Sequence, residues 1–211
     1  MPTYHERMAE QKRTAIVDAA TGLFLESGYD KTSLARIADA AGVSKATLFK
    51  QFPTKAELFD AIVTDYWRTD EGALTPRPGD PRKGLTALGN RYVALLTRPG
   101  MVALFRIVIA EAPRFPELGQ TQFKLGKQPF FDAVRDYLAA EHEAGTLRVD
   151  DPILAATQFL GMISNFAFWP RMLLMNWAPT EKAMARSVKE AVQTVLARHS
   201  VTTAPAASRR P

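Results

Sequence analysis

The sequence predicts an all-α fold of about nine helices, in which an N-terminal three-helix segment contains a helix-turn-helix and precedes a larger helical domain. Three observations support this fold class. Apolar residues recur at intervals of three and four through most of the 211 residues. Residues that cap helix N-termini, such as Ser44 and Asp151, precede several of these stretches. Glycine or proline stands where the apolar period stops, as at Gly28 and Pro170.

The composition is that of a globular protein that can bury a sizeable core. Hydrophobic residues make up 46% of the chain and charged residues 23%. There is no cysteine, which excludes a disulfide framework and thiolate metal sites and fits a reducing cytoplasm. The net charge of +5 suits a polyanionic partner without requiring one.

No membrane association is expected. Residues 1–13 are polar and lack the apolar region of a secretory signal. The most apolar stretch, 153–169, is interrupted by Gln158, Ser164 and Asn165, so we interpret it as a core or interface helix. We therefore expect a cytoplasmic protein.

The first helix is expected at residues 8–27, after a loose arm of residues 1–7. Its apolar stripe faces inward and braces the helices that follow, and Gly28 ends it. The stripe consists of Ile16, Ala19, Ala20, Leu23 and Phe24.

Residues 33–50 predict two short helices joined by a tight turn. Leu34 and Ile37 give the first helix an apolar face. Gly42 supplies the positive φ that closes a helix end, and Ser44 is a good N-cap for the second helix. A helix-turn-helix needs this arrangement, because its second helix must project far enough to enter the major groove of DNA.

The charge of the same stretch also favours DNA binding. Between residues 31 and 55 only Asp39 is acidic, and duplex DNA attracts a basic surface by counterion release. A helical hairpin with a solvated basic face is the alternative interpretation, but the turn, the cap and the charge occur together here. The basic residues are Lys31, Arg36, Lys45, Lys50 and Lys55.

A fourth helix is predicted from Thr54, which forms a capping box with Glu57, to about Trp67. Lys55 lies in the first turn, where the helix dipole disfavours a cation. A phosphate opposite Lys55 is expected to explain this lysine. The helix joins the basic hairpin to the apolar remainder of the chain.

Residues 10–67 resemble the TetR family of bacterial transcriptional regulators. The resemblance rests on Thr32-Ser33-Leu34, Ile37-Ala38, Ala41-Gly42-Val43-Ser44, Thr47-Leu48-Phe49, Phe52-Pro53 and Lys55-Ala56-Glu57-Leu58. It implies an all-helical homodimer with an N-terminal operator-binding domain and a C-terminal domain for an effector and the dimer contact. The family often has tyrosine where Phe49 stands, so the phenol that commonly contacts a phosphate is missing here.

The expected DNA-contacting residues lie on the two short helices and at the start of the fourth. Lysine donates to guanine O6 and N7, and the methyl groups of Ala46 and Thr47 suit a thymine methyl. The hydroxyls at the first N-terminus suit a phosphate, although capping alone also explains them. The full set is Thr32, Ser33, Arg36, Ser44, Lys45, Ala46, Thr47, Phe49, Lys50 and Lys55.

Residues 70–81 contain three prolines and two glycines and are interpreted as a domain boundary. The expected division is 1–69 for DNA binding and the connecting helix, 70–199 for effector binding and dimerisation, and 200–211 for a disordered tail. Further helices are expected at 82–97, 101–112, 116–144, 151–174 and 180–198. The long third of these carries Gly126 and Pro129, which predict a kink or two segments. The last two helices of each subunit are expected to form a four-helix dimer contact.

Residues 105–119 resemble the C-terminal region of AefR-like repressors, a TetR subfamily. Large soft side chains in this half suit a pocket for a hydrophobic or aromatic effector, although such residues are more often core. Glu111 and Arg114 are interpreted as a solvated corner, with a ligand contact as the alternative. The expected ligand-binding residues are Trp67, Phe105, Ile109, Phe123, Phe130, Met162, Phe166 and Trp169, with Arg106, Asn165 and Arg171 as polar anchors.

No motif suggests catalysis, a cofactor or a metal site. The chain lacks a Gly-rich phosphate loop and a nucleophile elbow, and its three histidines are far apart in sequence. The hypothesis is a ligand-responsive transcriptional regulator, most simply a repressor that leaves a palindromic operator when it binds a hydrophobic molecule. The alternatives are a helical small-molecule-binding protein or enzyme whose basic hairpin is incidental, and a protein that coats DNA without sequence preference.

Overall fold

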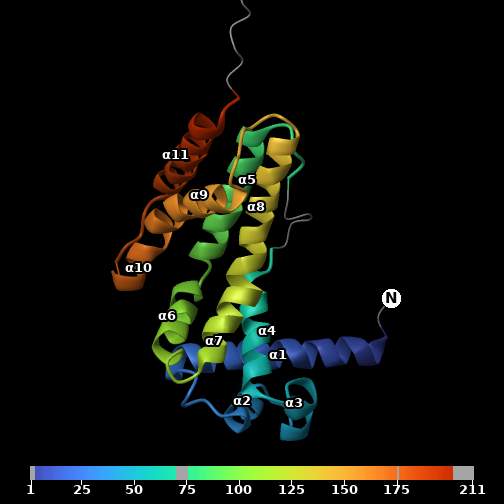
Figure 1. Cartoon of the computed structure of the whole chain (residues 1–211). Coiled ribbons are helices and arrows are strands. Elements are labelled where there is room, and N and C mark those ends of the chain that lie inside the picture. The colour runs from blue at the N-terminus through green and yellow to red at the C-terminus, as the bar shows by residue number, and fades with distance from the viewer. Residues whose placement is uncertain (1–2, 70–75, 175, 202–211) are drawn as a thin grey trace, which may run out of the picture. The chain divides into compact units, whose positions relative to one another are not determined.

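The computed structural model describes residues 3–69, 76–174 and 176–201, and the regular elements in this part of the chain are helices (Figure 1). Helices α7, η1 and α8 follow one another without a break, and counted as one they bring the described helical segments to ten. The all-α prediction is confirmed. The elements are α1 (Tyr4–Ser27), α2 (Leu34–Ala40), α3 (Lys45–Gln51), α4 (Lys55–Trp67), α5 (Pro81–Thr97), α6 (Met101–Glu111), α7 (Pro116–Thr121), the π-helix η1 (Gln122–Lys127), α8 (Gln128–Glu143), α9 (Pro152–Ala167), α10 (Trp169–Leu173) and α11 (Glu181–His199).

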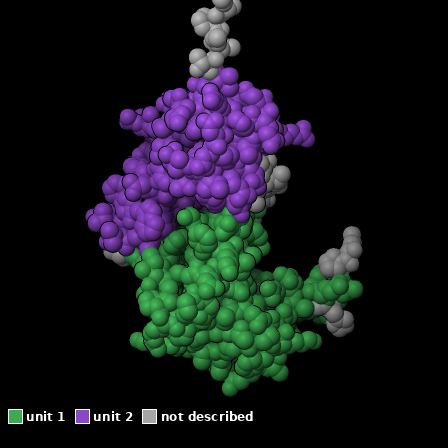
Figure 2. Space-filling view, in the orientation of Figure 1, with its two compact units in different colours: residues 1–70, 97–129 green, residues 71–96, 130–211 purple. Residues whose placement is uncertain are grey.

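The chain forms two compact units, coloured separately in Figure 2. Unit 1 contains residues 1–70 and 97–129, and unit 2 contains residues 71–96 and 130–211. Helices α6, α7 and η1 thus belong to the same unit as the N-terminal helices. The functional division at residue 69 stays a prediction, because compactness does not show which residues bind DNA. Most of the expected tail, residues 202–211, and part of the expected boundary, residues 70–75, lie outside the described residues.

Helix α1 begins four residues earlier than the sequence pattern indicated. Thr3 accepts a hydrogen bond from the Glu6 backbone N–H, and the Glu6 carboxylate accepts one from the Thr3 N–H at 2.6 Å. This capping box satisfies amides that a helix end otherwise leaves unpaired, so Tyr4 to Arg7 are helical. The expected loose arm is therefore wrong for residues 4–7. The Thr-x-x-Glu signal was present at residues 3–6 but lies outside the apolar stripe.

Unit 1 is built around α1 and α4. Helix α1 packs on α2, α4 and α6, and α4 packs on α7 and η1. The core uses the apolar faces that the helical period predicts, with Ile16, Phe24, Ile37, Leu48, Phe59 and Ile62 almost fully buried. Aromatic rings are concentrated at one end of this core, where Tyr29 contacts both Phe24 and Phe59.

The predicted interruption of the long helix is a π-helical turn. In η1 the Gln128 N–H bonds to the Phe123 carbonyl, five residues back. Pro129 follows at once, and a proline in a continuous α-helix would clash with the carbonyl four residues earlier. The wider π turn accommodates the proline without breaking the helix.

Unit 2 contains most of α5, α8 from Phe130 onward, and α9 to α11. Helix α9 packs on α11 through faces that include Phe159, Ile163 and Val192, all buried. Tyr92 of α5 stacks on Phe130 of α8 with ring centroids 5.3 Å apart. The Glu141 side chain is fully buried and accepts hydrogen bonds from the Tyr137 and Thr146 hydroxyls and the Gly79 N–H, so its carboxylate holds the start of α5 to the end of α8.

The helix expected at residues 151–174 is two helices, with the break two residues before Pro170. Helix α9 ends at Ala167, Phe168 leaves the helical region, and α10 is a separate five-residue helix. Pro170 cannot donate to the Phe166 carbonyl and would crowd it in a continuous helix, which explains why the chain breaks at Phe168. Phe168 is nevertheless buried, whereas Trp169 is half exposed.

The described helices do not include one that is both long and apolar enough to cross a membrane, although α5 and α6 taken together as a bent pair satisfy the length and composition criteria.

Gly89 tests the close packing of unit 2. A Cβ atom at this position would lie 2.6 Å from the Val188 Cγ1 atom, so Gly89→Ala is expected to destabilise the fold by about 1–3 kcal/mol through overpacking. Gly22 is the matched control, because a Cβ there meets nothing within 4 Å. Gly22→Ala in α1 is expected to stabilise by about 0.5–1 kcal/mol. Urea denaturation of the two variants checks both signs, and equal effects would contradict the packing described here.

Candidate nucleic-acid interface

Helices α2 and α3 form a helix-turn-helix that is capped at both N-termini. The Ser33 hydroxyl accepts from the Arg36 N–H at 3.2 Å, and the Ser44 hydroxyl accepts from the Thr47 N–H at 3.1 Å. Between the helices, Gly42 has φ 65°, a conformation that L side chains rarely adopt. The Val43 N–H bonds back to the Ala38 carbonyl at 3.0 Å, which closes the turn. The local signals in the sequence therefore produce the predicted motif.

The inner face of this pair is fixed by the core of unit 1. Ile37 and Ala38 of α2 and Leu48 of α3 are fully buried. Because these three residues anchor the two short helices, the opposite face of α3 is held outward. Lys45, Ala46, Phe49 and Lys50 are exposed there, and Thr47 is half-buried beside Ser44.

Phe49 is an unusual side chain for a solvent-facing position. Nearly half of its surface, 49%, is exposed, and it lies within one helical turn of both Lys45 and Lys50. A large apolar ring between two lysines suits a surface that is covered when a partner binds. On α2, Arg36 is exposed and donates to the Ser27 hydroxyl at 3.1 Å, which directs its guanidinium along the end of α1.

Thr32 and Lys55 do not have the phosphate-facing geometry that the sequence suggested. Thr32 is 1% exposed, and its hydroxyl donates to the Gly28 carbonyl at 2.8 Å. The Lys55 ammonium donates to the Tyr29 carbonyl at 2.7 Å and to the Thr32 carbonyl at 3.1 Å. Both expectations are corrected, since these groups bind the loop that precedes α2. An ammonium surrounded by carbonyl oxygens explains the first-turn lysine without a phosphate.

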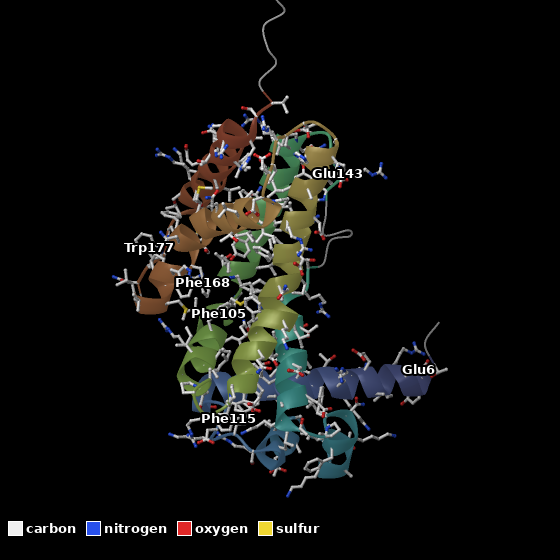
Figure 3. The ribbon with its side chains drawn as sticks, in the orientation of Figure 1. Glu6, Phe105, Phe115, Glu143, Phe168 and Trp177 are labelled. Carbon is white, nitrogen blue, oxygen red and sulfur yellow. The ribbon has the colours of Figure 1, made fainter. Side chains whose placement is uncertain are left out.

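Aromatic rings enclose the Lys55 ammonium. It lies 4.3 Å from the centroid of the Tyr29 ring, and Tyr29 in turn packs edge-on against Phe115. Burial lowers the pKa of Lys55 and raises the pKa of Tyr29 to about 12. Figure 3 shows Phe115 at the corner between α6 and α7. The loop that precedes α2 therefore contacts this corner as well as α4.

Two polar contacts strengthen the same junction. Arg114 forms an ion pair with Asp30 at 2.9 Å, and the Glu111 carboxylate accepts from the Asp30 N–H at 3.4 Å. Glu111 and Arg114 were expected to be a solvated corner. They are partly solvated but also bind the loop 81 to 84 residues earlier in the chain. Within unit 1, the AefR-like segment thus binds the loop that precedes the helix-turn-helix.

The face of unit 1 between α1 and α4 has the wrong charge for DNA. A groove of about 670 Å³ there is lined by five carboxylates and two arginines. Phosphates are repelled by such a surface, whereas the exposed face of α2 and α3 carries Arg36, Lys45 and Lys50. The charged residues are Glu10, Asp18, Glu57, Asp60, Asp65, Arg13 and Arg68.

The expected ligand-binding residues are divided between the two units. Trp67, Phe105, Ile109 and Phe123 belong to unit 1, and the remaining four to unit 2. In unit 1, Trp67 and Phe105 are brought together with ring centroids 6.4 Å apart, whereas Ile109 and Phe123 are more than half exposed. In unit 2, the rings have local partners: Phe130 stacks on Tyr92, Phe166 packs on Trp177, and the half-exposed Trp169 packs on Phe168, while Met162 is half-buried.

One buried polar side chain of unit 1 could not be predicted from the sequence. The Gln122 side chain is only 5% exposed, and neither its amide oxygen nor its amide nitrogen has a hydrogen-bond partner among the described residues. The Trp67 indole N–H, also buried, is unpaired in the same part of the protein. A buried unpaired polar group costs about 1–3 kcal/mol. A glutamine in a helix has no sequence signal for such burial, because most glutamines are on the surface.

Family models match both parts of the chain. A model of bacterial regulatory proteins of the tetR family matches residues 16–62. A model of the C-terminal domain of AefR-like transcriptional repressors matches residues 83–201, which is more than half of the chain.

Individual proteins are similar over most of their length. The HTH-type transcriptional regulator YvkB of Bacillus subtilis (strain 168) is 26% identical over 159 residues, covering 72% of this chain and 78% of YvkB. The HTH-type transcriptional repressor KstR of Rhodococcus jostii (strain RHA1) is 25% identical over 164 residues, covering 76% and 73%. Among solved structures, the Flavonoid-responsive Regulator FrrA is 28% identical with a TM-score of 0.74, covering 92% of this chain and 100% of FrrA. A TetR family transcriptional regulator from Pseudomonas syringae pv. tomato is 29% identical with a TM-score of 0.73, covering 90% and 98%.

The two lysines of this region are expected to behave differently. Lys45→Ala removes an exposed cation from α3, so it should weaken duplex binding and lower the slope of log affinity against log salt by about one unit. Lys55→Ala removes an internal clamp, so it should destabilise the protein by about 2 kcal/mol and leave the salt slope unchanged. Fluorescence anisotropy over a salt series and thermal melting separate the effects. If Lys55→Ala instead lowers the salt slope by about one unit, Lys55 does contact a phosphate.

Proposed function

The chain belongs to the TetR family of bacterial transcriptional regulators, and on that basis we propose that it is a ligand-responsive repressor that leaves a palindromic operator when it binds a hydrophobic small molecule. The observation that carries the proposal is the doubly capped helix-turn-helix, whose α3 presents two lysines and an exposed phenylalanine on one basic face. The groove between α1 and α4 is acidic, so this side of unit 1 is unfavourable for DNA.

In this proposal α3 enters the major groove and α2 contacts the backbone. Lys45 reads base edges near the N-terminus of α3, and the Ala46 and Thr47 methyl groups contact a thymine methyl. Phosphates are bound by Lys50, by Arg36 and by the backbone amides at the N-termini of α2 and α3, which Ser33 and Ser44 cap. Phe49 supplies apolar contact with sugars or a base methyl, where a tyrosine would donate a hydrogen bond.

TetR-family regulators act as dimers, and we propose that α9 and α11 form the dimer contact. The inner faces of these helices pack on each other within unit 2, so their outer faces are left for a partner. On α9 the outer face carries Ile153 and Leu154, which are 59% and 52% exposed, and the small Gly161. Exposed aliphatic residues on a helix indicate a surface that another copy covers.

We propose that the effector is an apolar, aromatic molecule that acts through α4. Trp67, at the end of this helix, faces Phe105, and Lys55, at its start, holds the loop before the recognition helices. A ligand that prefers one position of α4 therefore changes the spacing of the two recognition helices by its differential affinity. The similar protein FrrA is a flavonoid-responsive regulator, which supports an aromatic effector. The protein acts on operator DNA, so we place it in the cytoplasm and assign it no catalytic activity.

Selection of duplexes from a random DNA library by the purified protein is expected to enrich a palindrome whose half-sites are about one helical turn apart. The enriched duplex then serves as the probe for effectors that release the protein. Absence of enrichment, together with binding that is lost at modest salt, would refute sequence-specific regulation. Turnover or tight ligand binding without DNA affinity would instead favour an enzyme or carrier.

The dimer contact is tested with two leucines. Leu154→Arg places a charge on the outer face of α9 and is expected to shift the protein from dimer to monomer, with at least a tenfold loss of operator affinity. Leu173→Arg is the matched control, because Leu173 is 86% exposed on α10, outside the proposed contact. Sedimentation velocity gives the oligomeric state. If only the Leu173 variant is monomeric, the contact lies elsewhere.

A further inference from the structure

The Gln122 carboxamide is a complete hydrogen-bonding group without a described partner. Its side chain is 95% buried, and both Oε1 and Nε2 lack a hydrogen-bond partner among the described residues. Native proteins pair nearly all such groups with protein, water or ligand. An apolar residue of similar size at position 122 would avoid this free-energy cost, which indicates that the amide group has a function.

Gln122 belongs to η1 and Trp67 to α4, and these two helices pack on each other. Gln122 and Gly126 are the two buried residues of η1, about one π turn apart, so they share the face of η1 that packs on α4. A Cβ atom at Gly126 would lie 2.6 Å from the Trp67 Nε1 atom, which places the indole N–H against this face. The two unpaired side chains thus belong to one contact between α4 and η1.

An aromatic ring lies beside this pair, and the Arg98 guanidinium at the end of α4 already donates to the Tyr66 and Arg68 carbonyls on either side of Trp67. Phe105, which Figure 3 labels on α6, has its ring centroid 6.4 Å from that of Trp67. The lysines of η1, Lys124 and Lys127, are exposed, and the nearby Asp60 carboxylate already accepts from the Thr121 hydroxyl at 2.6 Å. A charged ligand would be left without a counter-ion here.

We infer that Gln122 and Trp67 form the polar anchor of the effector site and select a neutral aromatic molecule that carries a hydroxyl group. A hydroxyl both donates and accepts, so it pairs with Gln122 Oε1 and at the same time with Gln122 Nε2 or the indole N–H. A carbonyl would satisfy only the donors and leave Oε1 unpaired. The inference rests on the proposed function, since it gives the place and chemistry of the effector proposed above.

The anchor also explains how binding reaches the DNA-contacting helices. Trp67 is the last residue of α4, and Gln122 lies in the π-helix that packs on it. Pairing these two groups through one ligand changes the free energy of the contact between α4 and η1. Because Lys55 at the other end of α4 holds the loop before α2, the change is transmitted along a single helix.

The test compares two probes of matched size, 2-naphthol and 2-methylnaphthalene, by isothermal titration calorimetry on the full-length protein. The wild-type protein is expected to bind 2-naphthol roughly tenfold more tightly, the value of one or two net hydrogen bonds. Gln122→Leu is expected to bind both probes with similar affinity. Trp67→Phe keeps a ring and removes the N–H, so it should lose part of the preference. Gln120→Leu, at an exposed glutamine of α7, is the control that retains it.

Thermal melting without a ligand adds a second measurement. Gln122→Leu is expected to melt no lower than the wild-type protein, because it removes an unpaired buried group. A fall of several degrees means that an internal water or a structural partner completes the amide, which overturns the inference. An unchanged preference for 2-naphthol in Gln122→Leu overturns it too, as does the failure of the wild-type protein to bind either probe.

Repeating the titrations on the operator complex separates this inference from the proposed function. Selective binding that Gln122→Leu abolishes, without release of the operator, supports the anchor and refutes ligand-responsive repression. Release of the operator by both probes equally supports repression and refutes the anchor.

Discussion

The clamp formed by the Lys55 ammonium is the interaction on which the arrangement of unit 1 depends. One side chain in the first turn of α4 binds the carbonyl oxygens of Tyr29 and Thr32, which belong to the loop between α1 and α2. These carbonyls lie outside the helices, and the positive charge binds both at once, although the Tyr29 carbonyl also accepts from the Thr32 N–H at 3.3 Å. The position of α2, and of α3 behind it, is therefore set from α4. The tilted and edge-on rings of Phe24, Tyr29, Phe59 and Phe115 pack beside the same loop.

Helix α4 has a different neighbour at each end, so it connects two separate contacts within unit 1. At its start it holds the loop before the helix-turn-helix, and toward its end it packs on the π-helix η1. The π turn exists because Pro129 forbids a continuous α-helix. It also brings Gly126 close enough for the Trp67 indole to lie against backbone. One proline thus shapes the surface where the effector is proposed to act.

The AefR-like segment, residues 105–119, contacts the loop between α1 and α2. Arg114, Glu111 and Phe115 bind residues 29 and 30, so the corner after α6 is attached to the same loop as Lys55. The exposed ion pair contributes little stability by itself, since solvent screens it. Its importance lies in geometry, because it ties α6 and α7 to the part of unit 1 that carries the recognition helix.

The sequence by itself determined what depends on neighbours within a few residues: the helices, the caps at Ser33, Ser44, Thr54 and Asp151, the turn at Gly42 and the outward basic face of α3. These features follow from hydrogen bonds and periodicities that span about one helical turn. Only the tertiary structure decided which distant partner, if any, each of several polar side chains binds. Lys55 binds carbonyls 23 and 26 residues away, Arg114 binds a carboxylate 84 residues away, and Gln122 is buried without a partner. Such pairings depend on how helices distant in the chain pack, and a residue type alone does not show which way its side chain points.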